Sequence, residues 1–423
     1  MQAPDSDMSA VPLSLVARVL VVDEFGAAGL ESLRSFGCDA IHNRALHHST
    51  LHGAIRDLEP DVLIVRTMAV TEAALAACDR LGLIVCTGPS ADSIDVAAAS
   101  RRGIFVSHCP GRTAAAVAEL AWGLIVACDR RLPDAVASLR SGKWDPPAGA
   151  VAAGLAGRTL GIVGLGHVGQ EIARRGLAFG MHVVAWSRHI TEERCDAMGM
   201  DYCANLVNLA KLSDVISVSV TANEESVGLL GDKFFNAAKA NAILVNTSPS
   251  TVVNESALLA AVRTKGMRAG IELHDVAVAD RTRPSLAGLL NEPGVYATAQ
   301  VAALTEQARE ATDQEVVRTV RQWIDEGTVV GCVNRTTATS AVTLLHVRHL
   351  NKPGVLAEVF EVLGRSGINV EEMENVICAG GDAGIARIHV NATPTEGQVA
   401  AIRGAEHVLG VTVQAIHRDH DQP

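Results

Sequence analysis

The sequence predicts an α/β fold with two doubly wound parallel-sheet lobes and a small βαββαβ domain at its C-terminal end. Short apolar runs alternate with helical segments of about ten residues, and this alternation occurs in two successive series. Hydrophobic residues make up 48% of the 423 positions but aromatic residues only 3%. Aliphatic cores of this kind suit helices packed on parallel sheets. After the second series the order of strands and helices changes.

The first series predicts a lobe over residues 12–113. Its elements are "RVLVVD", a helix over Ala27–Ser35, "DVLIVRT", a helix over residues 72–79, "LGLIVCTG", a helix over residues 93–102 and "GIFVSH". Strands separated by such helices indicate a parallel sheet of the flavodoxin-like, doubly wound type. We expect the preceding residues, 1–11, to form a disordered tail.

The second series predicts a Rossmann-type lobe over residues 114–303. A long helix over residues 114–141 and the Pro- and Gly-rich connector "KWDPPAGAVAAGLAG" open it. Its strands are "RTLGIVGLG", "HVVAWS", "DVISVSV", "AILVNTS", "RAGIEL" and "GVYATA". A helix over residues 255–262, with Asn254 as its N-cap, follows the fourth strand. A helix over residues 305–326 ends the region.

The last segment predicts a separate module over residues 343–418. A Gly- and Thr-rich stretch precedes it and indicates a linker over residues 331–342. The elements of the module are "VTLLHVRHL", a helix over residues 356–366, "INVEEMENVI", "IARIHVN", a helix over residues 396–403 and "GVTVQAI". This order, βαββαβ, is the ferredoxin-like plan.

The charge balance and the cysteines limit the partners and the location. The formal net charge is −11, which argues against nucleic acid or a membrane surface as the main partner. A small anionic substrate stays possible, because local arginines can override the global sign. The nine cysteines show no metal-binding spacing, so we expect no metal site. Free thiols, no signal peptide and no membrane-length apolar run favour the cytoplasm.

A glycine motif after the first strand of the second lobe predicts a dinucleotide site. The stretch "TLGIVGLGHVGQEIARRG" places Gly164, Gly166 and Gly169 between an apolar strand and the start of a helix. Such glycines permit a tight turn and a close approach to a pyrophosphate, and the helix N-terminus offers amide donors from His167 and Val168. In this strand–turn–helix context the motif is a strong indication. Thr247, at a later strand end, is a further candidate contact.

The next strand end bears on the choice between NAD and NADP. An NAD site usually has Asp or Glu about 20 residues after the glycines. Here the strand ends with Ser187 and Arg188. Ser can bond a 2′-phosphate and Arg can pair with it, so the sequence favours NADP over NAD. Alternatively, Arg188 is a solvated loop residue.

Together these stretches resemble the D-isomer-specific 2-hydroxyacid dehydrogenase family. The matching stretches are "SIDVAAASRRGIFV", "AVAELAWGLIVA", "GKW", "AGRTLGIVGLGHVGQEIARRGLAFGM", "LSDVISV", "GLLGDKFFNAAKANAILVNTS" and "ALLAAV". The resemblance implies that the first lobe binds substrate and the second binds the cofactor. It also implies that residues 304–330 return to the substrate lobe, and that the protein is a homodimer or homotetramer.

The tail resembles an ACT domain, the regulatory module of many members of the D-3-phosphoglycerate dehydrogenase branch of this family. Serine-sensing versions hold their ligand with a His-x-Asn-x-Pro-Gly turn and a Gly-x-Asn stretch. The matching residues are His349, Asn351, Pro353, Gly354, Gly367 and Asn369. The resemblance implies that His349, Asn351 and Asn369 bind an amino-acid effector such as serine. Alternatively, the two asparagines only shape turns.

The resemblance fails at the catalytic positions. Family members use an Arg that fixes the substrate, a His that moves the hydroxyl proton and a Glu that orients the His. The Arg position holds Pro249, which has no side-chain donor, and the His position holds Gln300, which cannot accept a proton. The Glu position falls on Ala279. With one inserted residue, Asp275 matches the Asp of the motif and Asp280 takes the Glu position.

Other ionisable residues lie near the end of the strand "RAGIEL". They are Glu272, His274, Asp275, Asp280, Arg281 and Arg283. His274 is the candidate acid–base residue, although a lone His is more often structural. The resemblance also places substrate contacts in the first lobe. Arg66 matches a family Arg that holds the anionic substrate, the "GPSAD" loop keeps Gly88 but has Ser90 for the second Gly, and Arg112 stands where the family often has Asn.

Three functions remain open from the sequence. The first is an NAD(P)-dependent oxidoreductase with a rearranged site, acting on a 2-hydroxy or 2-oxo acid or another small anion. In it His274 is the acid–base residue, and Arg66 and Arg112 bind the anion. The second is a pseudoenzyme that senses amino-acid or nicotinamide levels. The third is a non-redox enzyme, a lyase or isomerase, that uses bound NAD(P) transiently.

Overall fold

Three β-sheets organise the residues that the structure describes. The computed structural model describes residues 16–88, 90–144, 152–274, 284–336 and 339–416. The chain divides into two compact units, Met1–Asn334 and Arg335–Pro423. Two of the sheets lie in the first unit and one in the second. Across the described ranges, every helix is too short or too polar to cross a lipid bilayer.

The first sheet has five parallel strands in the order β2-β1-β3-β4-β5. They are β1 (Arg18–Val21), β2 (Asp39–His42), β3 (Val62–Val65), β4 (Leu83–Cys86) and β5 (Phe105–His108). This flavodoxin-like order confirms the predicted fold class of the first lobe. The sequence pattern did not predict β2. That strand lies at the sheet edge and is only partly buried, so its sequence, DAIH, lacks an apolar run.

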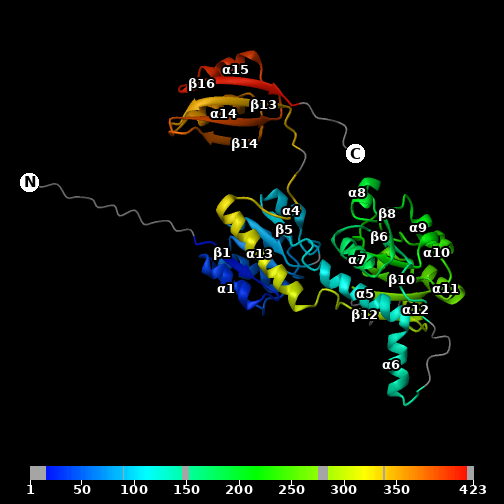
Figure 1. Ribbon diagram of the computed structural model, residues 1–423. Helices are drawn as coiled ribbons and strands as arrows, with labels where there is room; N and C mark the ends of the chain where they lie inside the picture. Colours follow the sequence, from blue (N-terminus) through cyan, green and yellow to red (C-terminus); the bar gives the residue numbers. More distant parts are fainter. Residues whose placement is uncertain (1–15, 89, 145–151, 275–283, 337–338, 417–423) are drawn as a thin grey trace, which may run out of the picture. The chain divides into compact units, whose positions relative to one another are not determined.

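Helices cover both faces of this sheet (Figure 1). They are α1 (Ala27–Ser35), α2 (His48–Leu58), α3 (Glu72–Leu75), α4 (Val96–Arg101) and α13 (Glu306–Glu326). Helices α1 and α13 share one core, to which α13 contributes Val316 and Val320. Helices α2, α3 and α4 share the other core. Thus the chain returns to this lobe through α13, as the yellow helix in Figure 1 shows.

The second sheet has seven parallel strands in the order β12-β11-β10-β9-β6-β7-β8. They are β6 (Thr159–Val163), β7 (His182–Trp186), β8 (Asp201–Tyr202), β9 (Val215–Val218), β10 (Ile243–Asn246), β11 (Arg268–Leu273) and β12 (Val295–Ala299). This is the Rossmann order, with the switch point between β6 and β9. Ligands of open α/β sheets bind at the carboxyl ends of the strands beside such a point.

Eight helices surround or adjoin the second sheet within the described residues. They are α5 (Ala114–Arg130), α6 (Leu132–Arg140), α7 (His167–Ala178), α8 (Glu192–Ala197), α9 (Leu206–Leu212), α10 (Asp232–Ala237), α11 (Glu255–Lys265) and α12 (Pro284–Leu290). The single helix predicted over residues 114–141 is two helices, because Arg131 adopts a left-handed φ of 51° between them. The predicted N-cap of α11 is confirmed: the Asn254 side chain accepts a hydrogen bond from the Ala257 amide.

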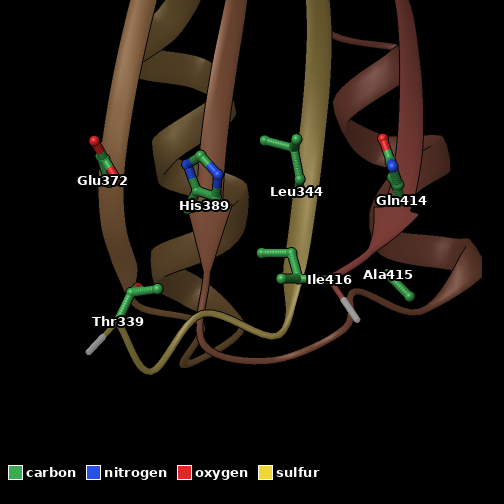
Figure 2. Close-up of a pocket in the computed structure, with 7 residues that line it drawn as sticks. All are labelled: Thr339, Leu344, Glu372, His389, Gln414, Ala415 and Ile416. Carbon is green, nitrogen blue, oxygen red and sulfur yellow. The ribbon is translucent and has the colours of Figure 1, made fainter. Parts of the chain in front are cut away.

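The second unit has the predicted order βαββαβ. Its elements are β13 (Thr343–Leu350), α14 (Val355–Arg365), β14 (Val370–Ile377), β15 (Ala383–Val390), α15 (Glu396–Arg403) and β16 (Val408–Ala415). The antiparallel sheet has the order β14-β15-β13-β16, and both helices pack on one face. On the other face, Leu344, Glu372, His389 and Gln414 line a hollow of about 450 Å³ (Figure 2). This uncovered face is therefore mixed in polarity.

Residues 330–334 extend the first sheet by a short antiparallel segment on β5. The Val333 amide donates to the Val106 carbonyl at 2.8 Å, and the Asn334 Oδ1 atom accepts from the Val106 amide at 2.9 Å. The linker predicted over residues 331–342 therefore begins as sheet structure. The paired segment, VGCVN, is short and contains Gly331, so the sequence did not indicate a strand there.

Candidate active site

Three glycines after β6 have three different structural roles. Gly164 has a φ of 93°, and a Cβ there would lie 2.5 Å from the Ser219 carbonyl oxygen. A Cβ on Gly169 would lie 2.0 Å from the Gly164 carbonyl oxygen. A Cβ on Gly166, by contrast, would meet no described atom within 4 Å. These are the tight turn, the close helix packing and the open approach that a dinucleotide loop needs.

The open space at Gly166 adjoins the N-terminus of α7. Gly166 is the N-cap of this helix, and His167 and Val168 are its first residues. Amides in the first turn lack intrahelical acceptors and carry the positive end of the helix dipole. The loop follows the carboxyl end of β6, which lies at the switch point of the sheet. The residues present therefore fit the pyrophosphate of a nicotinamide dinucleotide.

Replacing Gly166 with alanine separates this binding role from folding. We expect the unfolding midpoint to stay at the wild-type value, because the added methyl group meets open space. The dissociation constant of NADH or NADPH should rise at least about 10-fold, since the methyl group occupies the path of the pyrophosphate. Thermal unfolding and calorimetric titration measure the two quantities. The matched variant Gly169→Ala should instead destabilise the fold, and equal binding by Gly166→Ala and wild type would contradict the assignment.

The end of β7 carries the residues predicted to select the cofactor. Ser187 is partly buried and Arg188 is exposed. The Arg188 guanidinium forms an ion pair with Glu225, which lies in the loop after β9. Sequence reasoning missed Glu225, because the two residues are far apart in the chain and the glutamate lies in a loop without a motif.

The polar end of β10 is satisfied internally. The Asn246 Oδ1 atom accepts from the Ser248 amide at 3.0 Å, and the Ser248 hydroxyl accepts from the Val220 amide at 2.7 Å. Pro249 follows as the N-cap of a short 3₁₀ helix, Ser250–Val252. These polar side chains stabilise the strand end. None of them is a base or a cation, so the strand end supplies no acid–base group.

The carboxylate at the end of β11 is a structural anchor. Glu272 is fully buried, at 0% exposure. Its Oε1 atom accepts from the amides of Val301 and Ala302 at 2.6 and 2.9 Å, and its Oε2 atom accepts from the Thr298 hydroxyl. Sequence reasoning placed Glu272 among the ionisable residues of this strand end. Its bonds instead hold the segment that follows β12, which includes Gln300.

His274 and Gln300 are brought together beside this anchor. The His274 Nε2 atom donates to the Thr247 carbonyl oxygen at 3.0 Å, because a carbonyl can only accept. In the neutral ring, Nδ1 is then the nitrogen that can accept a proton. The Gln300 side chain donates to the His274 carbonyl, and Gln300 has an uncommon φ of 53°. The candidates Asp275, Ala279, Asp280, Arg281 and Arg283 lie outside the described residues.

Arg66 lies at the switch point of the first sheet, where β1 and β3 are neighbours. The Asp23 Oδ2 atom accepts from the amides of Arg66, Thr67 and Met68 at 2.8, 3.0 and 3.1 Å. A Cβ on Gly88 would lie 2.5 Å from the Arg66 carbonyl oxygen, so glycine is needed there. Asp23, which sequence reasoning missed, thus fixes the loop that carries Arg66.

Arg112 and Ser90 have local partners. The Arg112 guanidinium lies 3.3 Å from the carboxylate of Glu315, a buried residue of α13. Hydrogen bonds from Arg318, together with the charge of Arg112, hold the pKa of Glu315 below its usual range despite burial. The Ser90 hydroxyl donates to Asp92 at 2.7 Å. Arg112 is therefore partly neutralised, and sequence reasoning did not foresee Glu315.

The effector residues predicted in the second unit do not meet within one chain. The His349 ring is buried, with its nitrogens near the Leu350 carbonyl and the Asn375 amide oxygen. Asn351 follows β13 beside the start of β15, and its amide donates to the Gly381 carbonyl. Asn369 precedes β14 beside the end of β15. The two asparagines therefore lie at opposite ends of the sheet.

Comparison with known proteins decides the family. Residues 122–302 match the family described as "D-isomer specific 2-hydroxyacid dehydrogenase, NAD binding domain". A hydroxypyruvate reductase from Thermotoga maritima is 36% identical over 265 residues, which are 62% of this chain and 84% of the relative. The chain belongs to the D-isomer specific 2-hydroxyacid dehydrogenases. The resemblance seen in the sequence is thereby confirmed.

Further relatives extend the comparison. A D-3-phosphoglycerate dehydrogenase from Methanocaldococcus jannaschii is 30% identical over 308 residues, which are 73% of this chain but 57% of the relative. The chain thus spans little more than half the length of that relative. The crystal structure of an NADPH-dependent glyoxylate/hydroxypyruvate reductase from Sinorhizobium meliloti, in complex with NADP and malonate, is 26% identical. Its TM-score is 0.62, and the match covers 76% of this chain and 99% of that one.

Membership in the D-isomer specific 2-hydroxyacid dehydrogenases fixes the cofactor class. The matched domain is the NAD-binding domain of this family, and the S. meliloti reductase binds NADP. The cofactor of this family member is therefore a nicotinamide dinucleotide. In the structure, the glycine loop of the family lies at the Rossmann switch point, as the sequence motif predicted.

Proposed function

We propose that this chain is an NAD(P)-dependent oxidoreductase acting on the CH–OH group of a small 2-hydroxy acid, or on the matching 2-oxo acid, with a rearranged catalytic site. The observation that carries the proposal is the bond from His274 Nε2 to the Thr247 carbonyl. It orients an imidazole beside Gln300, at the strand ends where the family places its catalytic His. When bound, the cofactor supplies or accepts the hydride.

In this proposal His274 moves the proton through Nδ1. The hydroxyl proton of a 2-hydroxy acid must leave as the carbonyl forms, and an oriented imidazole is suited to accept it near neutral pH. Neither Pro249 nor Gln300 can do this. Asp275 or Asp280 could assist His274 in the place of the usual Glu, as the sequence suggested.

The anion contacts are assigned to the first lobe. Arg66 stands at the switch point of its sheet, on the loop that Asp23 fixes, and is the proposed partner of the substrate carboxylate. Arg112 is a second partner, with its charge reduced by Glu315. Gly88 and Ser90 lie on the neighbouring loop. The substrate-lobe role of residues 12–113 and 304–330, and the cofactor-lobe role of residues 114–303, are part of this proposal.

The remaining assignments are also proposed. Ser187 and Arg188 favour NADP over NAD, and Thr247 is a candidate cofactor contact. The module over residues 343–418 is proposed to be an ACT domain that binds an amino acid such as serine through His349, Asn351 and Asn369. Because the two asparagines lie at opposite ends of one sheet, a ligand held by both must lie between two copies. All nine cysteines are free, which supports a reducing cytoplasm.

The experiment follows the absorbance of reduced cofactor. Purified protein is mixed with NADPH or NADH and a panel of 2-oxo acids that includes 3-phosphohydroxypyruvate. Consumption of reduced cofactor with at least one acid is the expected result. Binding of cofactor without consumption across the panel would reject the oxidoreductase proposal.

A regulatory protein is the second candidate function. It is favoured because Pro249 and Gln300 stand at the positions of the usual catalytic Arg and His. The Gln300 side chain is also already bonded to the His274 carbonyl. A chain of this kind would bind dinucleotide and amino acid without turnover. The third candidate, a non-redox enzyme, would convert substrate without a net change in cofactor absorbance. Calorimetry with serine and with dinucleotide, run beside the absorbance assay, separates the three.

A homodimer is proposed from helix α6, which projects from the second lobe (Figure 1). None of its residues is buried, and Leu132, Val136 and Leu139 are 46%, 46% and 57% exposed. Spacings of four and three residues place these apolar side chains on one helix face. The variant Val136→Glu/Leu139→Glu should therefore shift the mass measured by light scattering to that of a monomer. The matched variant Ser138→Glu should not, and an unchanged mass for the double variant would remove α6 from the interface.

A further inference from the structure

The ion pair between Arg188 and Glu225 stands where the adenosine ribose is recognised. In Rossmann folds, the residue at the end of the second strand meets the ribose 2′-hydroxyl of NAD or the 2′-phosphate of NADP. Here that strand is β7, and Ser187 and Arg188 directly follow its last residue, Trp186. Neither residue is acidic. The carboxylate at this place comes from Glu225 instead, across the sheet in the loop after β9.

A fixed turn presents the Glu225 carboxylate. The Asn223 Oδ1 atom accepts from the amides of Glu225 and Ser226 at 3.1 and 3.0 Å. The Ser226 hydroxyl donates to the Thr221 carbonyl at 2.9 Å, and Ser226 is only 6% exposed. The Glu225 side chain itself is 73% exposed. The backbone of the turn is therefore anchored, while the carboxylate at its tip, paired with Arg188, is exposed to solvent and accessible to a ligand.

We infer that Glu225 sets the discrimination between NAD and NADP by competing with the 2′-phosphate for Arg188. A 2′-phosphate carries up to two negative charges, so it must displace the carboxylate from the guanidinium and then lie beside it. The 2′-hydroxyl of NAD is neutral and can donate to the same carboxylate. Glu225 thus opposes the NADP preference that Ser187 and Arg188 give. The inference rests on the proposed cofactor site.

The test compares two Glu→Gln substitutions at neighbouring positions of one loop. Glu225→Gln removes the charge that pairs with Arg188, and Glu224→Gln removes the same charge from the neighbouring exposed residue. Calorimetric titrations with NADPH and NADH give the dissociation constants. For Glu225→Gln, the dissociation constant of NADPH should fall by about 5- to 20-fold at low salt. The substitution removes both the ion pair that competes for Arg188 and the negative charge that repels the 2′-phosphate. The NADH constant should stay the same or rise.

The second arm removes the cation. In an Arg188→Leu background, the Glu225→Gln substitution should lower the NADPH constant by less than about 3-fold, since only the repulsion remains to be relieved. The inference is overturned if Glu225→Gln changes the constants for NADPH and NADH equally, or if Glu224→Gln has the same effect. Absence of binding by either dinucleotide to the wild-type chain would instead overturn the cofactor site itself.

Discussion

Replacing His274 with alanine is expected to lower kcat for the conversion of a 2-hydroxy acid by about 10²- to 10⁴-fold, the usual loss when a general base is removed. The dissociation constants of NADH and NADPH should not change, because His274 follows β11, whereas the glycine loop that is assigned to the pyrophosphate follows β6. Stopped assays with each purified protein give kcat, and calorimetry gives the constants.

A matched variant controls for the loss of a histidine as such. His182 is exposed at the N-terminal end of β7, away from the carboxyl ends of the strands where the site lies. His182→Ala should therefore leave kcat unchanged. A His274→Ala protein that keeps the wild-type rate would assign the proton transfer to another group.

Replacing Glu272 with alanine is expected to lower the free energy of unfolding by about 3 kcal/mol, because it leaves two backbone amides, one of them buried, without an acceptor. Those amides belong to Val301 and Ala302, and the Thr298 hydroxyl loses its acceptor as well. The segment that bears Gln300 should loosen too. Urea denaturation of the full chain measures the change.

Two matched variants make the Glu272 result specific. Glu272→Gln keeps an acceptor oxygen in place and should cost about 1 kcal/mol. Glu310→Ala removes an exposed carboxylate from α13 and should stay within about 0.5 kcal/mol of wild type. Equal losses for the alanine variants at 272 and 310 would show that the buried bonds contribute no special stability.

Sequence patterns predicted the elements whose signals are local. Helices α1 and α15 have the expected bounds, Ala27–Ser35 and Glu396–Arg403, because each has an amphipathic face between clear turn signals. The break between α5 and α6 was not predicted. It depends on the left-handed backbone of Arg131, a conformation that carries little residue-level signal outside glycine. Strand β2 was missed because an edge strand needs no continuous apolar run.

The candidate site was predictable only where a motif fixes the geometry. The glycine loop was found because strand, turn and helix follow one another in sequence. Glu272 was read as a group available for chemistry, since its partners lie on the next strand and beyond. Glu225, Asp23 and Glu315 were missed for the same reason: each meets its partner only after the sheets have formed. Pairings of distant residues leave no spacing pattern to detect.

The short segment over residues 330–334 has a consequence for the integrity of the first lobe. It covers β5, an edge strand whose open hydrogen-bonding groups would otherwise invite another chain to pair with them. The segment therefore protects the edge strand from pairing with another chain, in addition to connecting the two units. The N-terminal fragment, which contains both lobes, should accordingly remain dispersed when the chain is cut after Asn334, and self-associate when it is cut directly after α13.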